Sequence, residues 1–185
     1  NVSFRDADGV DFASIITNGT LAVVAGGAIS DSGTLAVAGA VSFKTLNDTA
    51  GAAPITLDDD GVLPLSNSFG ALALATRNAL DALPVATAVT VREDSAMDLA
   101  SLSSAGSVTL QSNGAVSDSG ALEAASLSVT AVGGVALDVA SQIGGFSATN
   151  SSTGAVTLTN NTAPSMTLAG VSQGAGTGAV TIVNA

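Results

Sequence analysis

The sequence predicts an all-β protein, a parallel β-solenoid (β-helix) of about eight coils with roughly 22 residues in each. An internal duplication, short strand-like triplets and the turn residues between them lead to this prediction. Residues 2–35 align without a gap to residues 89–122, and 13 of these 34 pairs are identical. The offset of 87 residues divides into about four coils of solenoid length.

Short apolar–polar–apolar triplets, some with Ala at the centre, recur along the chain. Alternation of this kind is typical of strands with one buried and one solvated face, and the Gly, Asn, Asp and Ser between them predict turns. The triplets are 2–4, 21–23, 35–37, 41–43, 55–57, 72–74, 89–91, 108–110, 127–129, 135–137, 156–158, 166–168 and 180–182.

The pattern indicates one solenoid segment over residues 1–185, with super-repeats at 1–88 and 89–179 and a third copy beginning near 180. A sandwich or barrel is the alternative, with hairpin turns at Asn18-Gly19 and Asn113-Gly114. A helix over 71–83 competes with the triplet 72–74. The chain begins and ends on triplets without polar caps, so we expect both ends to stack on further coils of a longer chain or of another copy.

Composition excludes several classes of function. The net charge is −11, with Arg5, Lys44, Arg77 and Arg92 as the only cations, so nucleic acid is not an expected partner. The chain has no Cys, His, Trp or Tyr and only five Phe, so Val, Leu, Ile and Ala must fill most of the interior. Polar residues interrupt each apolar run, so we do not expect the chain to span a membrane.

Two acidic segments resemble calcium-binding loops. Asp6, Asp8 and Asp11 surround Gly9, and Asp58, Asp59 and Asp60 precede Gly61. The duplicate replaces Asp8 and Gly9 with Ser95 and Ala96 while keeping the adjacent strands, which favours solvated turns. We therefore predict no metal site and no cofactor, and leave calcium binding at these six aspartates open.

Other candidate sites favour structural roles. Glu93 and Asp94 adjoin Arg92, but successive strand residues point to opposite faces, so at most one carboxylate shares Arg92's surroundings. Without His, Tyr or Trp beside them, we predict no catalytic site. The Gly pairs at 26–27, 133–134 and 144–145 indicate turns.

The Ser-Asp-Ser-Gly segments 30–33 and 117–120 predict coil corners, in which Asp bonds nearby backbone N–H groups and Gly has positive φ. The outward residues of the triplets mix Ser, Thr and Ala, so the sequence lacks the regular Thr ladder of an ice-binding solenoid.

Residues 16–43 and 106–131 resemble the repeat regions of filamentous-haemagglutinin-like bacterial exoproteins. The resemblance implies a right-handed parallel β-helix from a large adhesin exported by two-partner or autotransporter-type secretion. We therefore expect a structural, fibre-forming segment at the bacterial cell surface or in an extracellular matrix. Its expected partners are flanking coils or copies of itself. The alternatives are an adhesin that recognises host or cell-surface glycans, or a carbohydrate-active enzyme.

Overall fold

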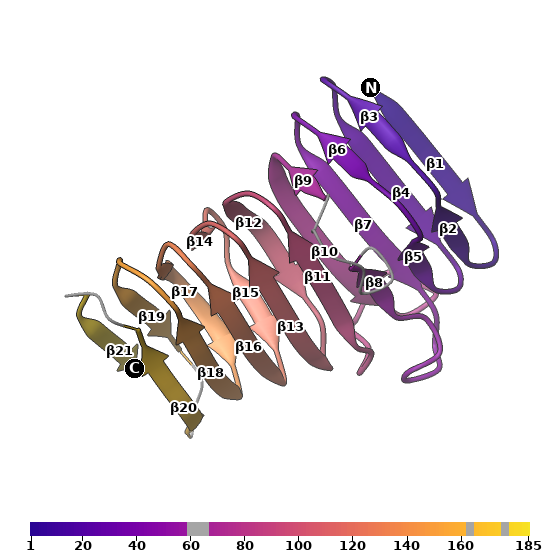
Figure 1. Cartoon of the computed structure of the whole chain (residues 1–185). Helices are drawn as coiled ribbons and strands as arrows, with labels where there is room; N and C mark the ends of the chain where they lie inside the picture. The colour runs from indigo at the N-terminus through magenta and orange to yellow at the C-terminus, as the bar shows by residue number, and fades with distance from the viewer. Residues whose placement is uncertain (59–66, 162–164, 175–177) are drawn as a thin grey trace.

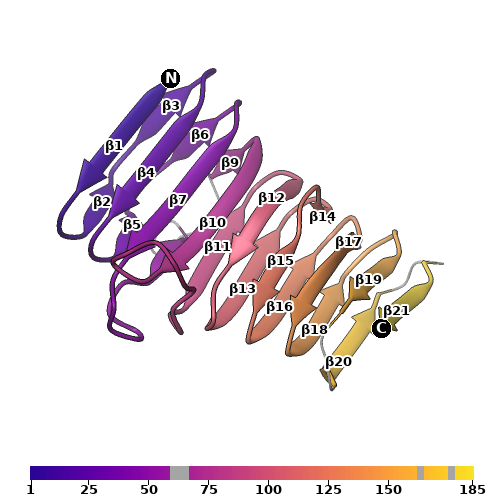
Figure 2. The same ribbon diagram turned by 180° about the vertical axis from the view of Figure 1, so that it is seen from behind.

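The computed structural model describes residues 1–58, 67–161, 165–174 and 178–185, which form 21 strands and contain no helix. The strands stack in parallel along one axis, and the chain termini lie at opposite ends of the rod (Figures 1 and 2). The predicted all-β solenoid of about eight coils is confirmed.

Each of the first three coils has three strands, one on each side of the rod. In chain order they are β1 (Val2–Asp6), β2 (Val10–Phe12), β3 (Ile15–Thr17), β4 (Leu21–Ala25), β5 (Ile29–Asp31), β6 (Leu35–Val37), β7 (Val41–Leu46), β8 (Ile55–Leu57) and β9 (Ser68–Phe69).

The later coils use longer strands and a different arrangement of sides. Their strands are β10 (Ala71–Arg77), β11 (Val89–Glu93), β12 (Met97–Ser103), β13 (Ser107–Ser112), β14 (Val116–Asp118), β15 (Leu122–Ala124), β16 (Ser126–Ala131), β17 (Val135–Ile143), β18 (Gly145–Asn150), β19 (Val156–Asn160), β20 (Thr167–Gln173) and β21 (Val180–Asn184).

The strands form three sheets, which we call A, B and C. Sheet A has the order β1-β4-β7-β10-β12-β14-β17-β19-β21, with β15 paired to β12 and β17. Sheet B has the order β2-β5-β8-β11-β13-β16-β18-β20, and sheet C the order β3-β6-β9. Among the described residues the only antiparallel contact is an isolated bridge between Arg77 and Pro84, so the sandwich with hairpins is wrong.

The register stacks like residues on like, with Val2, Leu21, Val41 and Leu72 in one column of sheet A. Coil length varies: Leu21 follows Val2 by 19 residues, whereas Leu72 follows Val41 by 31. The connections after β7 and β10 account for part of this variation and stand out from the rod (Figure 2). They lie against each other, since the backbone N–H of Gly51 donates to the carbonyl of Ala86 at 3.0 Å.

The third side of the rod changes place along the axis. Sheet C supplies it up to β9; beyond β9 sheet A bends, so that β14 and β15 both lie in sheet A in the same coil. The duplicated strands consequently lie in different sheets. Strand β1 of sheet A is the sequence equivalent of β11 of sheet B, and β5 of sheet B is the equivalent of β14 of sheet A.

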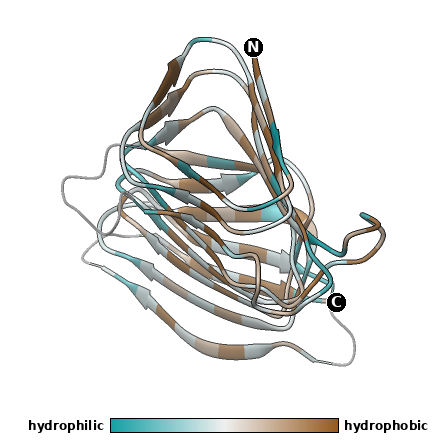
Figure 3. Cartoon of the chain, turned by 90° about the vertical axis from the view of Figure 1, so that its right-hand side faces the viewer, coloured by the Kyte–Doolittle hydropathy of each residue, from teal (hydrophilic) through white to brown (hydrophobic). Residues whose placement is uncertain are grey.

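The core runs along the axis inside the coils, which outline a roughly triangular section when viewed along the stack (Figure 3). Aliphatic side chains fill most of it, as expected. The rings are unevenly placed: Phe4, Phe12, Phe43 and Phe69 lie in the first three coils, and Phe146 lies far from them in β18. Phe4 packs edge-on against Phe12 with ring centroids 5.6 Å apart, and Phe43 packs against Phe69 at 5.9 Å.

The predicted triplets lie in strands, except that β20 begins one residue after Met166. The helix considered at 71–83 is wrong, because β10 continues to Arg77 and bends and turns follow it. The triplet pattern does not predict the short strands β2, β3, β5, β9, β14 and β15, or the longer strands β12 and β18.

Candidate functional site: polar contacts between successive coils

Buried polar side chains occupy corners of the rod, where one strand ends and the next begins or, for Ser141, where the register of β17 shifts. At each corner a side-chain oxygen of one coil accepts a hydrogen bond from a backbone N–H of the preceding coil. The strand ladder is interrupted there, and an unpaired buried amide costs about 1–3 kcal/mol. The pairs are Asn67 with Leu35 (2.8 Å), Glu93 with Phe69 (2.9 Å), Ser141 with Leu122 (3.1 Å), Asn150 with Gly134 (3.0 Å) and Asn160 with Ile143 (2.8 Å).

Asn160 extends this linkage along the axis. Its Nδ2 donates to the carbonyl of Ile143 at 3.0 Å and to Oδ1 of Asn184 at 2.8 Å. Ser141, Asn160 and Asn184 occupy paired positions on successive coils of sheet A. The result is a short amide ladder parallel to the rod, in which side chains continue the hydrogen bonding of the strands.

The aspartates of the two Ser-Asp-Ser-Gly segments accept hydrogen bonds from backbone N–H groups, as predicted, and these donors include residues of the next coil. Oδ1 of Asp31 accepts from the N–H of Asp58 at 2.8 Å, and Oδ2 accepts from Nδ2 of Asn67 at 2.6 Å. Oδ1 of Asp118 accepts from the N–H of Asp138 at 2.9 Å. Burial raises the pKa of Asp118 above its ordinary value.

The serines of these segments reach back to the preceding coil on the outer surface. Ser30 and Ser32 donate from Oγ to the carboxylate of Asp11 at 2.9 and 2.6 Å. In the duplicate, Ser119 donates to Asp98 at 3.0 Å. Each segment therefore contacts the coils on both sides of it.

Close approach between coils explains the glycines of these segments. The prediction that Gly33 and Gly120 have positive φ is wrong. A Cβ at Gly33 would clash with the carbonyl oxygen of Ala13, and one at Gly120 with that of Ala100. Both corners thus need a residue without a side chain so that the coils can stack.

Glu93 and Asp94 point to opposite sides of β11, as predicted. Asp94 is exposed and accepts from Nδ2 of Asn113 at 2.9 Å. Glu93 is 0% exposed; its Oε1 also accepts from Oγ of Ser95 at 2.7 Å, and its buried Oε2 has no hydrogen-bond partner. Burial raises the pKa of Glu93 to about 7.

In the first calcium-like segment, Asp6 ends β1, residues 7–9 form a turn, and Asp11 lies within β2. Oδ1 of Asp6 accepts from the N–H of Asp8 at 2.9 Å, which closes a local Asx-type turn. Asp58 lies beside Asp31, whereas Asp59 and Asp60 fall outside the described residues. Within the described ranges no group of three or more metal-ligating side chains is placed to hold an ion.

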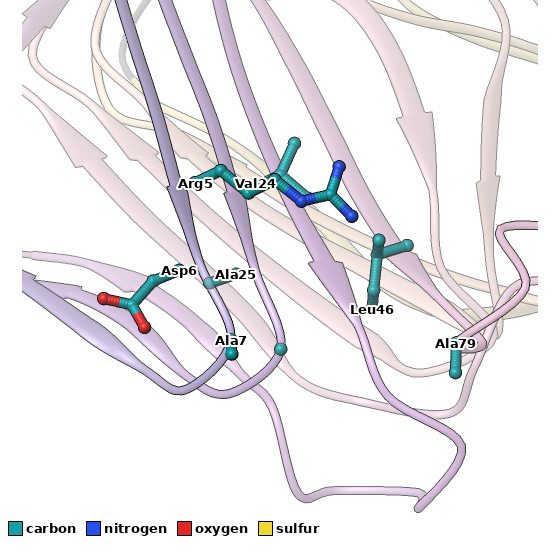
Figure 4. A pocket seen from close by; sticks show the side chains of 8 residues that line it. Arg5, Asp6, Ala7, Val24, Ala25, Leu46 and Ala79 are labelled. Carbon is teal, nitrogen blue, oxygen red and sulfur yellow. The ribbon is translucent and has the colours of Figure 1, made fainter.

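A wide, open depression of about 440 Å³ lies beside β1 and β4. Arg5 and Asp6 are the charged residues that line it. Figure 4 shows Arg5 extending toward Leu46 while Asp6 points the other way. The pocket therefore does not bring an acid and a base together on one substrate position.

Two salt bridges fix the connection that follows β10. Lys44 Nζ lies 2.7 Å from Oδ2 of Asp81, and Arg77 Nε lies 3.4 Å from Oδ1. The hydrogen bond from Lys44 and the charge of Arg77 lower the pKa of Asp81. Leu80 and Leu83 in this connection are 85% and 65% exposed.

Outward-facing Ser, Thr and Ala residues are mixed along the sequence, but the strand register sorts them between sheets. On sheet B, hydroxyl residues align on successive strands, whereas sheet A mixes Ala with Ser and Thr. The hydroxyl column of sheet B is Thr56, Thr90, Thr109, Ser128 and Ser147.

A second column runs parallel to the first on the same face of sheet B. It contains Gln111, Thr130, Thr149 and Ser172. An open hollow of about 350 Å³ lies between the two columns at Gly170.

The described part of the chain offers no helix of the length and apolarity that a membrane span requires. No curated protein and no solved structure matches the sequence. A family model described as repeats of unknown function (DUF5649) matches residues 1–81 and 86–159. These segments cover well over half of the chain, which therefore belongs to this repeat family.

Proposed function

We propose that the chain is a structural segment of an extracellular bacterial fibre, in an adhesive surface filament or a matrix, and that it has no catalytic role. The observation that carries the proposal is the double linkage between coils. Parallel strands pair along the sides of the rod, and buried side chains such as Asn67 and Asn160 join the coils at corners. Hydrogen bonds along the axis make such a rod stiff.

Exposed apolar residues at both ends support stacking on further coils. Val2 and Phe4 are 39% and 36% exposed, whereas Leu21 and Val23, which pair with them on the next coil, are 1% and 0% exposed. Val180, in the last strand, is 48% exposed. Another coil, from a longer chain or a second copy, would bury these residues and pair the outer strands.

Electron microscopy of the native protein tests this function. We expect rods with an axial repeat of about 4.8 Å, the spacing of paired strands. For self-stacking, the isolated chain should form rods that lengthen with concentration. Phe4→Asp should shorten them, while Ile16→Asp, which changes a residue 78% exposed, should not. Globular particles from the native protein would contradict the fibre.

The hydroxyl columns of sheet B favour a second candidate, binding of cell-surface glycans. Hydroxyl groups offer both donors and acceptors to sugars, although the face has no aromatic ring for stacking. A glycan array tests this function with the intact chain. Ser128→Ala with Ser147→Ala should weaken binding, and Ser42→Ala on sheet A should not. Absence of any retained glycan would contradict it.

A further inference from the structure

Glu93 lies where the rod changes its construction. Strand β9 is the last strand of sheet C, and Phe69 in β9 donates its N–H to Oε1 of Glu93 at the end of β11. Beyond this level, sheet A supplies the third side. The carboxyl of Glu93 therefore joins the last strand of sheet C to the first coil that lacks it.

The chemistry of Glu93 differs from that of the other corner acceptors. Asn67, Asn150 and Asn160 use amides and Ser141 uses a hydroxyl, all of which stay neutral at any physiological pH. Glu93 performs the same task with an ionisable group that is 0% exposed. A buried carboxylate is costly unless a cation or several donors compensate it.

Hydrogen bonds compensate only partly for the burial of the Glu93 carboxyl. Oε1 receives two hydrogen bonds, from Phe69 and Ser95, but the buried Oε2 receives none. On its own strand, Arg92 lies at an outward position, and Asp94 is exposed and bonded to Asn113.

Among the described residues, no cation contributes to the electrostatic environment of the Glu93 carboxyl. The paired position on β13 is Ser112. On the other side, Asn67 of the preceding coil donates to Asp31, which lies one coil further back and also accepts from the N–H of Asp58. Ser68 of the preceding coil lies against Ser95. Loss of solvation on burial is therefore the main influence on this carboxyl, and it favours a proton on Glu93 rather than a charge.

We propose that Glu93 is a protonation-dependent latch, whose neutral carboxyl holds β9 against β11 and whose ionisation loosens the rod at the end of sheet C. The pKa of about 7 lies above the ordinary value, so the folded state binds this proton more tightly than the unfolded chain does. The contribution of protonated Glu93 to the free energy of unfolding is fully present below the pKa that this side chain has in the unfolded chain. It is lost as pH rises through about 7, the pKa in the folded state.

Carboxyl NMR on the intact chain tests the protonation itself. The sequence contains two glutamates, Glu93 and Glu123, so ¹³C-labelled glutamate gives two carboxyl signals, and Glu93→Gln assigns them. We expect the Glu93 signal to titrate near pH 7, and hydrogen exchange at the Phe69 amide, corrected for its intrinsic rate, to accelerate above that pH. A Glu93 signal that titrates below pH 5, or a pH-independent corrected exchange rate at Phe69, would overturn the latch.

Urea unfolding between pH 5.5 and 8 tests its energetic effect. The chain contains no His, so few other groups titrate in this window. We expect the folding equilibrium constant of the natural chain to fall roughly thirtyfold between pH 5.5 and 8, because part of the linked change already lies below pH 5.5. Glu93→Gln should remove most of this dependence, whereas Asp94→Asn, a matched change on the exposed side of β11, should retain it. Equal pH dependence in all three proteins would overturn the latch.

Discussion

The first three coils and the coils from β10 onward close the same kind of rod in different ways. The first section has a separate sheet C as its third side and contains four of the five Phe residues. The second section bends sheet A instead and has a mostly aliphatic interior with one ring, Phe146. A third side supplied by a separate sheet thus coincides with aromatic packing.

The buried polar side chains at the corners also differ between the two ends of the rod. In the first section Asp31 is buried and receives hydrogen bonds from the next coil, and Glu93 lies at the boundary. In the last coils Asn150 and Asn160 perform the equivalent task, and the sequence has no charged residue after Asp138. Neutral amides keep the corner hydrogen bonds without the cost of burying charge, so we expect the last coils to depend less on pH than the coils that contain Asp31, Glu93 and Asp118.

Removing a buried ring from either section should have the largest effect on the free energy of unfolding. Phe43→Ala should lower the free energy of unfolding by about 3–5 kcal/mol, the usual cost of emptying a buried ring site. Phe146→Ala should cost less by about 0.5–1.5 kcal/mol, because only Phe43 packs edge-on against another ring, Phe69. Thermal and urea unfolding measure both changes. Equal losses would show that the ring pair adds nothing to the first section.

The duplicated glycines test whether both sections stack equally tightly. Gly33→Ala and Gly120→Ala should each destabilise the rod by about 3 kcal/mol, because the new methyl group meets a carbonyl oxygen of the preceding coil. Gly145→Ala is the control, since its Cβ would lie 3.5 Å from Ser126, an ordinary contact. Melting temperatures give the comparison, and an unchanged value for either corner variant would refute close approach at that corner.

Local alternation in the sequence predicted strands, and the internal duplication favoured a solenoid over a sandwich or barrel. The alternation identified the longer strands of the first coils, and it placed Glu93 and Asp94 on opposite sides of β11. It missed strands such as β5 and β14 because their central triplets contain a buried or half-buried Asp in place of an apolar residue. A pattern of alternating apolar and polar residues predicts a turn, and not a strand, where an aspartate stands at an inward position.

The partners of the corner residues could not be predicted in the same way. Asp31 bonds Asn67, which lies 36 residues later, and the unequal coil lengths between them hide that register. A signal for the outer contacts was present, however. Asp11 precedes Ser30 by 19 residues, and Asp98 precedes Ser117 by the same distance, so the duplication preserved a spacing of one coil.

Replacing an asparagine that accepts a hydrogen bond at a corner should lower the free energy of unfolding by an intermediate amount. Asn160→Ala should cost about 1–3 kcal/mol, because the N–H of Ile143 loses its acceptor in a buried site. Asn67→Ala should cost more, because it removes the acceptor for Leu35 and also a donor to the carboxylate of Asp31. Hydrogen exchange at Leu35 and Ile143 localises each loss. A smaller cost for Asn67→Ala would contradict the stronger role assigned to charged corners.

The surface ion pair beside β7 should have the smallest effect. Lys44 and Asp81 are partly exposed, so Lys44→Ala should cost less than about 1 kcal/mol, and added salt should reduce the difference. The pKa of Asp81 is lowered, so its contribution is present above the unfolded pKa and is lost as pH falls through the lower folded value. Urea unfolding at low and high salt, and at pH 6 and 3, measures these dependences. A loss as large as that of Asn160→Ala would show that the connection after β10 supports the rod, because an isolated exposed pair does not supply that much stability.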